Sequence, residues 1–301
     1  MLSLIVANGF LACTFTLTKF LLHFFPPFYI AAFRCLGSGF LSAGLLFSAR
    51  NKKLIPVFKN RKMAFMFARV VLFSTIVVYS CESWALQYVT TTKVTLIYSS
   101  SLFIMALYSY YYFDELLTLK KWLGLCMGFT GVVLVLVSDS PSEELIIAFG
   151  KISWPELALL VGIASECYGW VYQRILMREH HVSYVQMDSL AWLAGGFFML
   201  AVALKTEPIG VLYEPWRAFG FLGLLIIGAF FAGSWISSLF SYYSLTILSF
   251  AGLLLPVFTG ILGYLFLGEK ISYAMIISML LISSGMYIFY QEELRQNNIL
   301  F

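Results

Sequence analysis

The sequence predicts an all-α integral membrane protein with about ten transmembrane helices in a 5+5 inverted repeat. The first observation is composition: 61% of the 301 residues are hydrophobic, 11% are charged, and the mean hydropathy is +0.88. Soluble domains average roughly 45–50% apolar and about 25% charged residues, so a soluble fold could not bury this much apolar surface. The other two observations are a series of long apolar stretches and an internal repeat.

Apolar stretches of about 20 residues, the length at which a helix crosses the hydrocarbon core, follow one another along the chain. Pro26 and Pro27 separate the first two stretches, and Asp114 and Glu115 separate the fourth from the fifth. The expected spans are 2–24, 27–48, 63–86, 91–113, 119–138, 155–176, 184–204, 218–241, 246–267 and 271–290.

The distribution of Lys and Arg predicts that both termini are cytoplasmic. With the N-terminus inside, the inside segments carry 11 basic residues and the outside segments carry 4, which is the bias that the positive-inside rule describes. An even number of spans is then required. The inside residues are Arg50, Lys52, Lys53, Lys59, Arg61, Lys62, Lys120, Lys121, Arg174, Arg178 and Arg295; the outside residues are Lys151, Lys205, Arg217 and Lys270.

The two halves of the chain resemble each other. Phe113–Thr118 is similar to Leu267–Ser272, and their acids Glu115 and Glu269 are 269 − 115 = 154 residues apart. Five spans per half place the second half upside down in the membrane, as in many transporters whose solute binds near the midplane. The same offset pairs Tyr88 with Tyr242, Tyr110 with Tyr264, Gly131 with Gly285 and Arg34 with Asp188. The expected parts are a first repeat at 1–138, a linker at 139–153, a second repeat at 154–290 and a cytoplasmic tail at 291–301.

Sequence motifs typical of nucleotide-driven pumps and of intramembrane enzymes are missing from the sequence. It contains no GxxxxGK[ST], HExxH or GxSxG motif and no pair of intramembrane Asp residues. We therefore expect no enzyme, no direct use of ATP, no cofactor, no metal and no nucleic-acid partner. A non-transporting membrane scaffold is the alternative of another class, although the chain lacks a sizeable soluble domain. The five cysteines lie in apolar segments and are interpreted as small hydrophobic residues: Cys13, Cys35, Cys81, Cys126 and Cys167.

Several short segments together resemble a known family. The segments are Tyr88–Thr92, Ser101–Phe103, Phe113–Glu115, Trp122–Gly124, Gly128–Val133, Pro256–Phe258 and Leu267–Glu269. The chain is similar to EamA-type members of the drug/metabolite transporter superfamily. The resemblance implies ten helices in two inverted repeats, a central cavity and alternating access, most naturally in a bacterial inner membrane. It does not imply one solute.

Glu166 is the first candidate site residue because an ionisable group deep in an apolar span is costly. Gly162, Gly169 and Trp170 share its helix face at spacings of three and four residues. We expect Glu166 to contact a cationic group of the solute or to carry a proton. The alternative is that it pairs with a buried cation and braces the bundle.

Two cations in the first two spans are candidates for holding a carboxylate or phosphate. These are Lys19 and Arg34, and Arg is suited to bidentate capture. The alternatives are that Lys19 snorkels to the surface and that Arg34 braces a helix. Glu82 is expected to pair with one of them, as a gate or as a brace.

Two further charges are interpreted mainly as structural. Asp188 is expected to be a gate or an inner brace rather than a solute contact. Lys93, at the start of the fourth span, is grouped with Glu82 and Asp188 as a gate or brace, and it is expected to snorkel rather than to steer anions in a cavity.

Aromatic and hydroxyl side chains complete the expected substrate site: Tyr98, Ser100, Trp170 and Trp235. Aromatic faces hold cations. A site with the cations Lys19 and Arg34 at one side and the acid Glu166 at the other suits a zwitterion. S-adenosylmethionine or S-adenosylhomocysteine is the first candidate, and an amino acid or another metabolite of the same superfamily is the alternative. The expected partners are this solute, the lipid bilayer, and a counter-solute or a proton.

Overall fold

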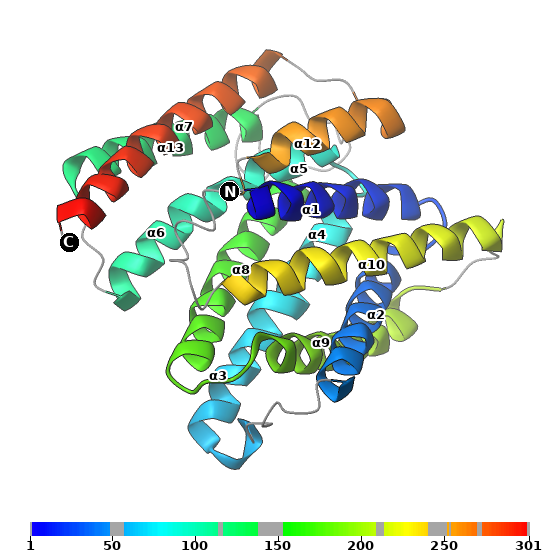
Figure 1. The fold of residues 1–301 in the computed structure, drawn as a ribbon. Coiled ribbons are helices and arrows are strands. Elements are labelled where there is room, and N and C mark those ends of the chain that lie inside the picture. Colours follow the sequence, from blue (N-terminus) through cyan, green and yellow to red (C-terminus); the bar gives the residue numbers. More distant parts are fainter. Residues whose placement is uncertain are drawn as a thin grey trace.

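The computed structural model describes residues 2–48, 57–113, 117–137, 153–208, 214–239, 252, 254–269 and 273–299. These residues form a bundle of helices, and they include no strand (Figure 1). Six helical stretches among them are long and apolar enough to cross a membrane: Pro27–Ser48, Arg61–Ala85, Thr91–Tyr112, Tyr184–Thr206, Pro215–Leu239 and Tyr273–Glu292. Two shorter apolar helices run over Val6–Leu21 and Leu255–Leu267.

Each apolar stretch of the sequence contains a helix in its described part. The helices are α1 (Leu2–Leu21), α2 (Pro27–Ser48), α3 (Arg61–Val71), α4 (Val78–Ala85), α5 (Thr91–Tyr98), α6 (Ser100–Phe113), α7 (Leu119–Val137), α8 (Trp154–Arg178), α9 (Tyr184–Thr206), α10 (Pro215–Leu239), α12 (Leu254–Leu262) and α13 (Tyr273–Ile299). The 3₁₀ turn η1 (Val57–Lys59) precedes α3. The linker 139–153 lies outside the described residues except for Ser153.

Two helical stretches contain a π-helical turn. The turn η2 (Leu72–Val77) joins α3 to α4, and η3 (Gly263–Leu267) follows α12. Helix α13 runs on to Ile299, so the segment expected as a tail after residue 290 continues a helix. The polar residues after Tyr290 include no Gly or Pro to end it.

Local sequence explains several helix ends. Pro27 stands first in α2, where its missing N–H costs nothing. The next backbone N–H, that of Phe28, donates to Glu207 Oε2 at 3.0 Å. Glu207 directly follows α9, so its carboxylate ties the C-terminus of α9 to the positive end of α2. Asn60 caps α3 by accepting the Lys62 N–H at 3.0 Å.

Helices distant in sequence pack as pairs: α2 with α9, α7 with α13, and α1 with α10 (Figure 1). The α7–α13 pair is close because glycines face each other. A Cβ added to Gly124 would lie 2.5 Å from the carbonyl oxygen of Gly285, closer than real Cβ contacts allow. Any side chain at either position would therefore push the two helices apart.

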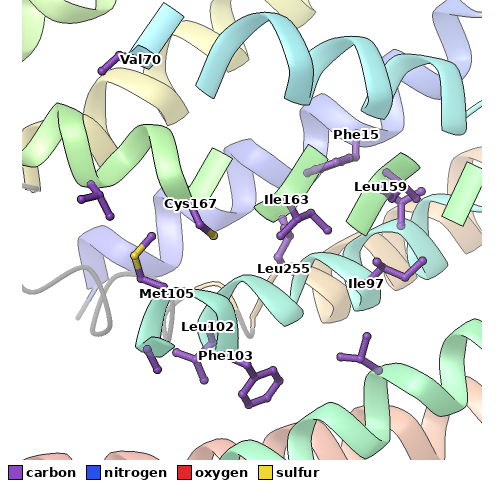
Figure 2. Close-up of a cluster of buried hydrophobic side chains, with 14 of the residues drawn as sticks. Phe15, Val70, Ile97, Leu102, Phe103, Met105, Leu159, Ile163, Cys167 and Leu255 are labelled. Atoms are coloured by element: carbon purple, nitrogen blue, oxygen red, sulfur yellow. The ribbon is translucent and has the colours of Figure 1, made fainter. Parts of the chain in front are cut away.

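The interior and the outer surface are both apolar. Figure 2 shows the main buried cluster, in which Leu159, Ile163 and Cys167 of α8 lie beside side chains from other helices. Many large apolar side chains lie exposed on the outside, including Phe47 at 80% and Trp216 at 90% exposure. This outer apolar surface is suited to lipid, and the chain is a membrane protein.

Candidate functional site

A central cavity of about 140 Å³ lies between the helices, and one water needs about 10–15 Å³. Its walls come from α1, α2, α3, α4, α5, α6, α8, α9, α10, α12 and the turn η2. The charged side chains in its lining are Arg34, Glu82, Glu166 and Asp188. All four were singled out from the sequence, and the fold brings them together from four different helices.

Arg34 and Glu82 form a buried ion pair in the cavity wall. Arg34 Nη1 lies 2.8 Å from Glu82 Oε1, and the two side chains are 5% and 4% exposed. The Tyr98 hydroxyl donates to Glu82 Oε2 at 3.1 Å, and the guanidinium lies over the Tyr79 ring, 4.0 Å from its centroid. The second terminal nitrogen of Arg34, Nη2, is buried without a hydrogen-bond partner among the described residues. Arg34 thus keeps one free donor.

Glu166 lies midway along α8 and lines the cavity. Within the described parts of the chain, no hydrogen bond or ion pair joins its carboxylate to another residue. Trp170, one turn further along the same helix face, also lines the cavity. The glycines that share this face, Gly162 and Gly169, pack against α4 and η2 instead of leaving space beside the carboxylate.

Asp188 also lines the cavity and accepts hydrogen bonds from neighbouring side chains. Its Oδ1 accepts from the Ser237 hydroxyl at 2.8 Å and from Gln173 Nε2 at 3.3 Å. Gln173 also donates to the Ser237 hydroxyl at 3.2 Å. These donors are uncharged, so they orient the Asp188 carboxyl group without neutralising a charge on it.

The π-helical turn η2 forms part of the cavity wall through Ser74 and Thr75. A π turn displaces the regular hydrogen-bond ladder, and such turns are frequent at functional sites. The Phe73 carbonyl accepts from the Ser165 hydroxyl of α8 at 2.9 Å. A Cβ at Gly169 would lie 2.6 Å from Ser74 Cβ, so this glycine permits the close contact between α8 and η2.

Three of the residues expected to bind substrate do not line this cavity: Lys19, Ser100 and Trp235. The Lys19 ammonium donates to the carbonyl oxygens of Leu86 at 2.5 Å and Val89 at 2.8 Å, beyond the end of α4. It therefore binds free carbonyls at a helix end, where a cation is favoured. Ser100 is buried in the wall between lining residues Ser99 and Ser101.

The expectation that Lys93 snorkels to the surface is wrong. Lys93 is fully buried, and its Nζ lies 2.5 Å from Glu156 Oε1, which is also fully buried. Glu156 stands in the first turn of α8 and also accepts the Ser153 N–H at 2.7 Å. The acid at the start of one span neutralises the cation at the start of another. Sequence reasoning missed Glu156 because a carboxylate in the first turn of a helix has an ordinary capping role.

Gln173 and Trp192 line the cavity and were not singled out. Gln173 is seven residues after Glu166, and therefore lies on the same helix face two turns on. The spacing of seven residues from Glu166 could have identified Gln173 as a lining residue from the sequence. Trp192 is four residues after Asp188 on α9, which is the spacing of Trp170 from Glu166 on α8.

Comparison with known families supports the same architecture. Residues 1–137 and 153–291 match the EamA-like transporter family, which lies in the drug/metabolite transporter superfamily. The chain belongs to the EamA-like transporter family. A transporter family implies a small-molecule solute and a membrane, and it does not imply an enzyme.

Curated EamA-like relatives span nearly the whole chain. An S-adenosylmethionine/S-adenosylhomocysteine transporter of Chlamydia muridarum (strain MoPn / Nigg) is 28% identical over 99% of this chain and 93% of its own length. A protein of the same description from Chlamydia trachomatis serovar L2 is also 28% identical, over 99% of this chain and 91% of its own. A solved structure, described only as the crystal structure of a protein, matches 95% of this chain and 93% of its own with TM-score 0.64 and 18% identity. It supports the fold alone.

Proposed function

We propose that this chain is a secondary transporter of S-adenosylmethionine and S-adenosylhomocysteine, which alternately opens its central cavity to the two sides of the membrane. The observation that carries the proposal is that Arg34 Nη2 and the Glu166 carboxylate line the same cavity and that neither has a partner among the described residues. The names of the Chlamydia relatives support this choice of solute.

The cavity offers a complementary group for each end of such a zwitterion. Arg34 Nη2 would donate to the solute carboxylate, and Arg is the side chain best suited to that contact. Glu166 would face the cationic part of the solute. Trp170 and Trp192 line the same cavity and present faces for the adenine ring or the sulfonium.

The arrangement in the membrane is part of the proposal. We infer ten spans in a 5+5 inverted repeat, with repeats at 1–138 and 154–290 and both termini in the cytoplasm of a bacterial cell with the chain in its inner membrane. The packed pairs support the repeat. An offset of 154 carries the start of α7 onto the start of α13, since 119 + 154 = 273, and carries the start of α2 to within three residues of the start of α9, since 27 + 154 = 181 and α9 begins at Tyr184. Helices related by such an offset meet at the pseudo-two-fold axis of an inverted repeat.

Competition for uptake in proteoliposomes tests the solute. We expect unlabelled S-adenosylmethionine and S-adenosylhomocysteine to inhibit uptake of labelled S-adenosylmethionine more strongly than adenosine, phenylalanine or a nucleotide sugar. Adenosine lacks both charged ends and a nucleotide sugar lacks the cationic end, so each leaves a buried protein charge unpaired, at a cost of about 1–3 kcal/mol, or roughly tenfold to hundredfold in affinity. Phenylalanine has both charged ends but lacks the adenine ring that Trp170 and Trp192 would contact.

Three outcomes would contradict the proposal. Strongest inhibition by the nucleotide sugar would indicate an anion transporter, and strongest inhibition by phenylalanine would indicate an amino-acid transporter. No uptake of any of these solutes by monodisperse protein would favour a membrane scaffold. Empty liposomes and liposomes with the exposed-site variant Glu214→Gln serve as controls, since Glu214 is 57% exposed and pairs only with Arg217 among the described residues.

A further inference from the structure

The charges in the cavity lining do not balance. Arg34 is the single cation among the described lining residues, and Glu82 already neutralises it at 2.8 Å. Two carboxyl groups, Glu166 and Asp188, are left without a cation in that lining. Asp188 accepts two hydrogen bonds from neutral donors, whereas Glu166 receives none from the described residues.

An ionised carboxylate in a low-dielectric interior is costly unless a cation or several donors stabilise it. A carboxyl group in this position has two ways to avoid the cost: it binds a positive charge, or it takes up a proton. Glu166 satisfies both requirements for alternating between them, because it lines the cavity where a solute would bind and makes no ion pair with another described residue.

The two proposed solutes differ by one positive charge. S-adenosylmethionine has an ammonium, a sulfonium and a carboxylate, with a net charge of about +1 at neutral pH; S-adenosylhomocysteine has a thioether in place of the sulfonium and is a neutral zwitterion. If the net charge of the cavity were fixed, a cavity that neutralises one solute would therefore differ by one elementary charge from the value that neutralises the other.

Resting on the proposed function, we propose that Glu166 replaces the sulfonium charge with a proton. Glu166 is a carboxylate when S-adenosylmethionine is bound and a carboxylic acid when S-adenosylhomocysteine is bound. The net charge of the loaded cavity is then the same with either solute. During exchange, S-adenosylmethionine crosses in one direction, S-adenosylhomocysteine and one proton cross in the other, and no net charge moves.

Other ionisable groups line the cavity around Glu166, and they are less suited than Glu166 to alternate between a charged and a protonated form. The Glu82 carboxylate is held by Arg34 and Tyr98, so it has no need of a proton. Asp188 Oδ1 accepts from Gln173 and Ser237, and its Oδ2 is buried without a partner among the described residues, so neutral donors already stabilise half of this carboxyl group. The titratable or charged groups around Glu166 are Arg34 of α2, Tyr79 and Glu82 of α4, Tyr98 of α5, Cys167 of α8 and Asp188 of α9.

The first test uses wild-type protein in proteoliposomes loaded with S-adenosylhomocysteine and a pH-sensitive dye, with labelled S-adenosylmethionine outside. We expect one proton to leave the lumen for each S-adenosylmethionine that enters, so the lumen becomes more alkaline. The exchange rate should not change when valinomycin and a potassium gradient impose a membrane potential. Exchange that responds to the potential and moves no proton would overturn the inference and leave the proposed function standing. Absence of any exchange would overturn both.

The second test uses Glu166→Gln, which imitates the protonated acid. We expect this variant to keep exchange of S-adenosylhomocysteine for itself and to lose at least about tenfold in uptake of S-adenosylmethionine, because the sulfonium then meets a neutral group. Asp188→Asn is the matched variant, and any exchange that it retains should still move one proton per solute pair. An equal loss of transport of both solutes in Glu166→Gln would contradict the assignment. Proton movement that is abolished in Asp188→Asn but kept in Glu166→Gln would also contradict it. The proton count of the wild type decides the question if Glu166→Gln does not fold.

Discussion

Buried and partly buried charges occur in two regions of this molecule, and they have different numbers of partners within the protein. At the helix ends, Lys93 pairs with Glu156 at 2.5 Å, Lys19 binds two backbone carbonyls, and Glu269 accepts four hydrogen bonds from Thr91 and Thr92. We call these four charged side chains the helix-end brace. In the cavity, Arg34 keeps a free donor and Glu166 has no partner among the described residues.

The contrast separates structural charges from charges available to a solute. A buried charge whose partners are all in the protein stabilises one arrangement of helices and has little left to offer a ligand. A buried charge that lacks an ion-pair or hydrogen-bond partner lowers the stability of the protein until a ligand binds it. The predictions below test this division through the free energy of unfolding.

The largest effect is expected from breaking the Lys93–Glu156 pair. Lys93→Met should lower the free energy of unfolding by about 3–5 kcal/mol, because the Glu156 carboxylate would be left buried without a cation. Denaturant unfolding in detergent micelles, followed by tryptophan fluorescence, measures the change. The double variant Lys93→Met/Glu156→Gln should recover most of the loss, since it removes both charges.

Lys62→Met is the matched control, because Lys62 is exposed at the start of α3 and should change stability by less than about 0.5 kcal/mol. Wild-type stability in the single variant Lys93→Met would show that the pair is not part of the brace.

A smaller effect is expected at Glu269, whose carboxylate caps α5. Its oxygens lie 2.7 Å from the Thr91 nitrogen and 2.8 Å from the Thr91 hydroxyl. Glu269→Gln keeps the shape and loses the charge, so the free energy of unfolding should fall by about 1–2 kcal/mol. Equilibrium binding of S-adenosylmethionine to the folded variant, measured by scintillation proximity, should match wild type. A binding defect without a stability defect would move Glu269 from the brace to the site.

The smallest effect on stability is expected at Glu166, although it lies midway along α8 in the cavity lining. Glu166→Gln should change the free energy of unfolding by less than about 1 kcal/mol, since no protein partner is left unpaired. The variant should stay monodisperse in size-exclusion chromatography while uptake of S-adenosylmethionine is lost. Collapse of the variant would mean that Glu166 is half of a structural ion pair, contrary to the division drawn above.

The sequence identified the cavity charges better than it identified their partners. Arg34, Glu82, Glu166 and Asp188 were all predictable, because an ionisable side chain within an apolar span is conspicuous. Their pairing was only half predictable: Arg34 or Lys19 was expected to hold Glu82, and the fold selects Arg34. Side chains that look ordinary in an apolar span, such as Trp192 and Gln173, gave weaker signals.

The sequence by itself determined the membrane class, the helical segments and which charges lie within apolar segments, because hydropathy, turn residues and the period of a helix are local properties. Only the tertiary structure decided which charges meet. Lys93 and Glu156 are 63 residues apart, as 156 − 93 = 63, and their contact depends on how α5 and α8 pack. The same packing placed Lys19 on the carbonyls of Leu86 and Val89 and left Glu166 facing a cavity. A buried charge is partnered or unpartnered only in three dimensions, and that distinction separates the helix-end brace from the candidate site.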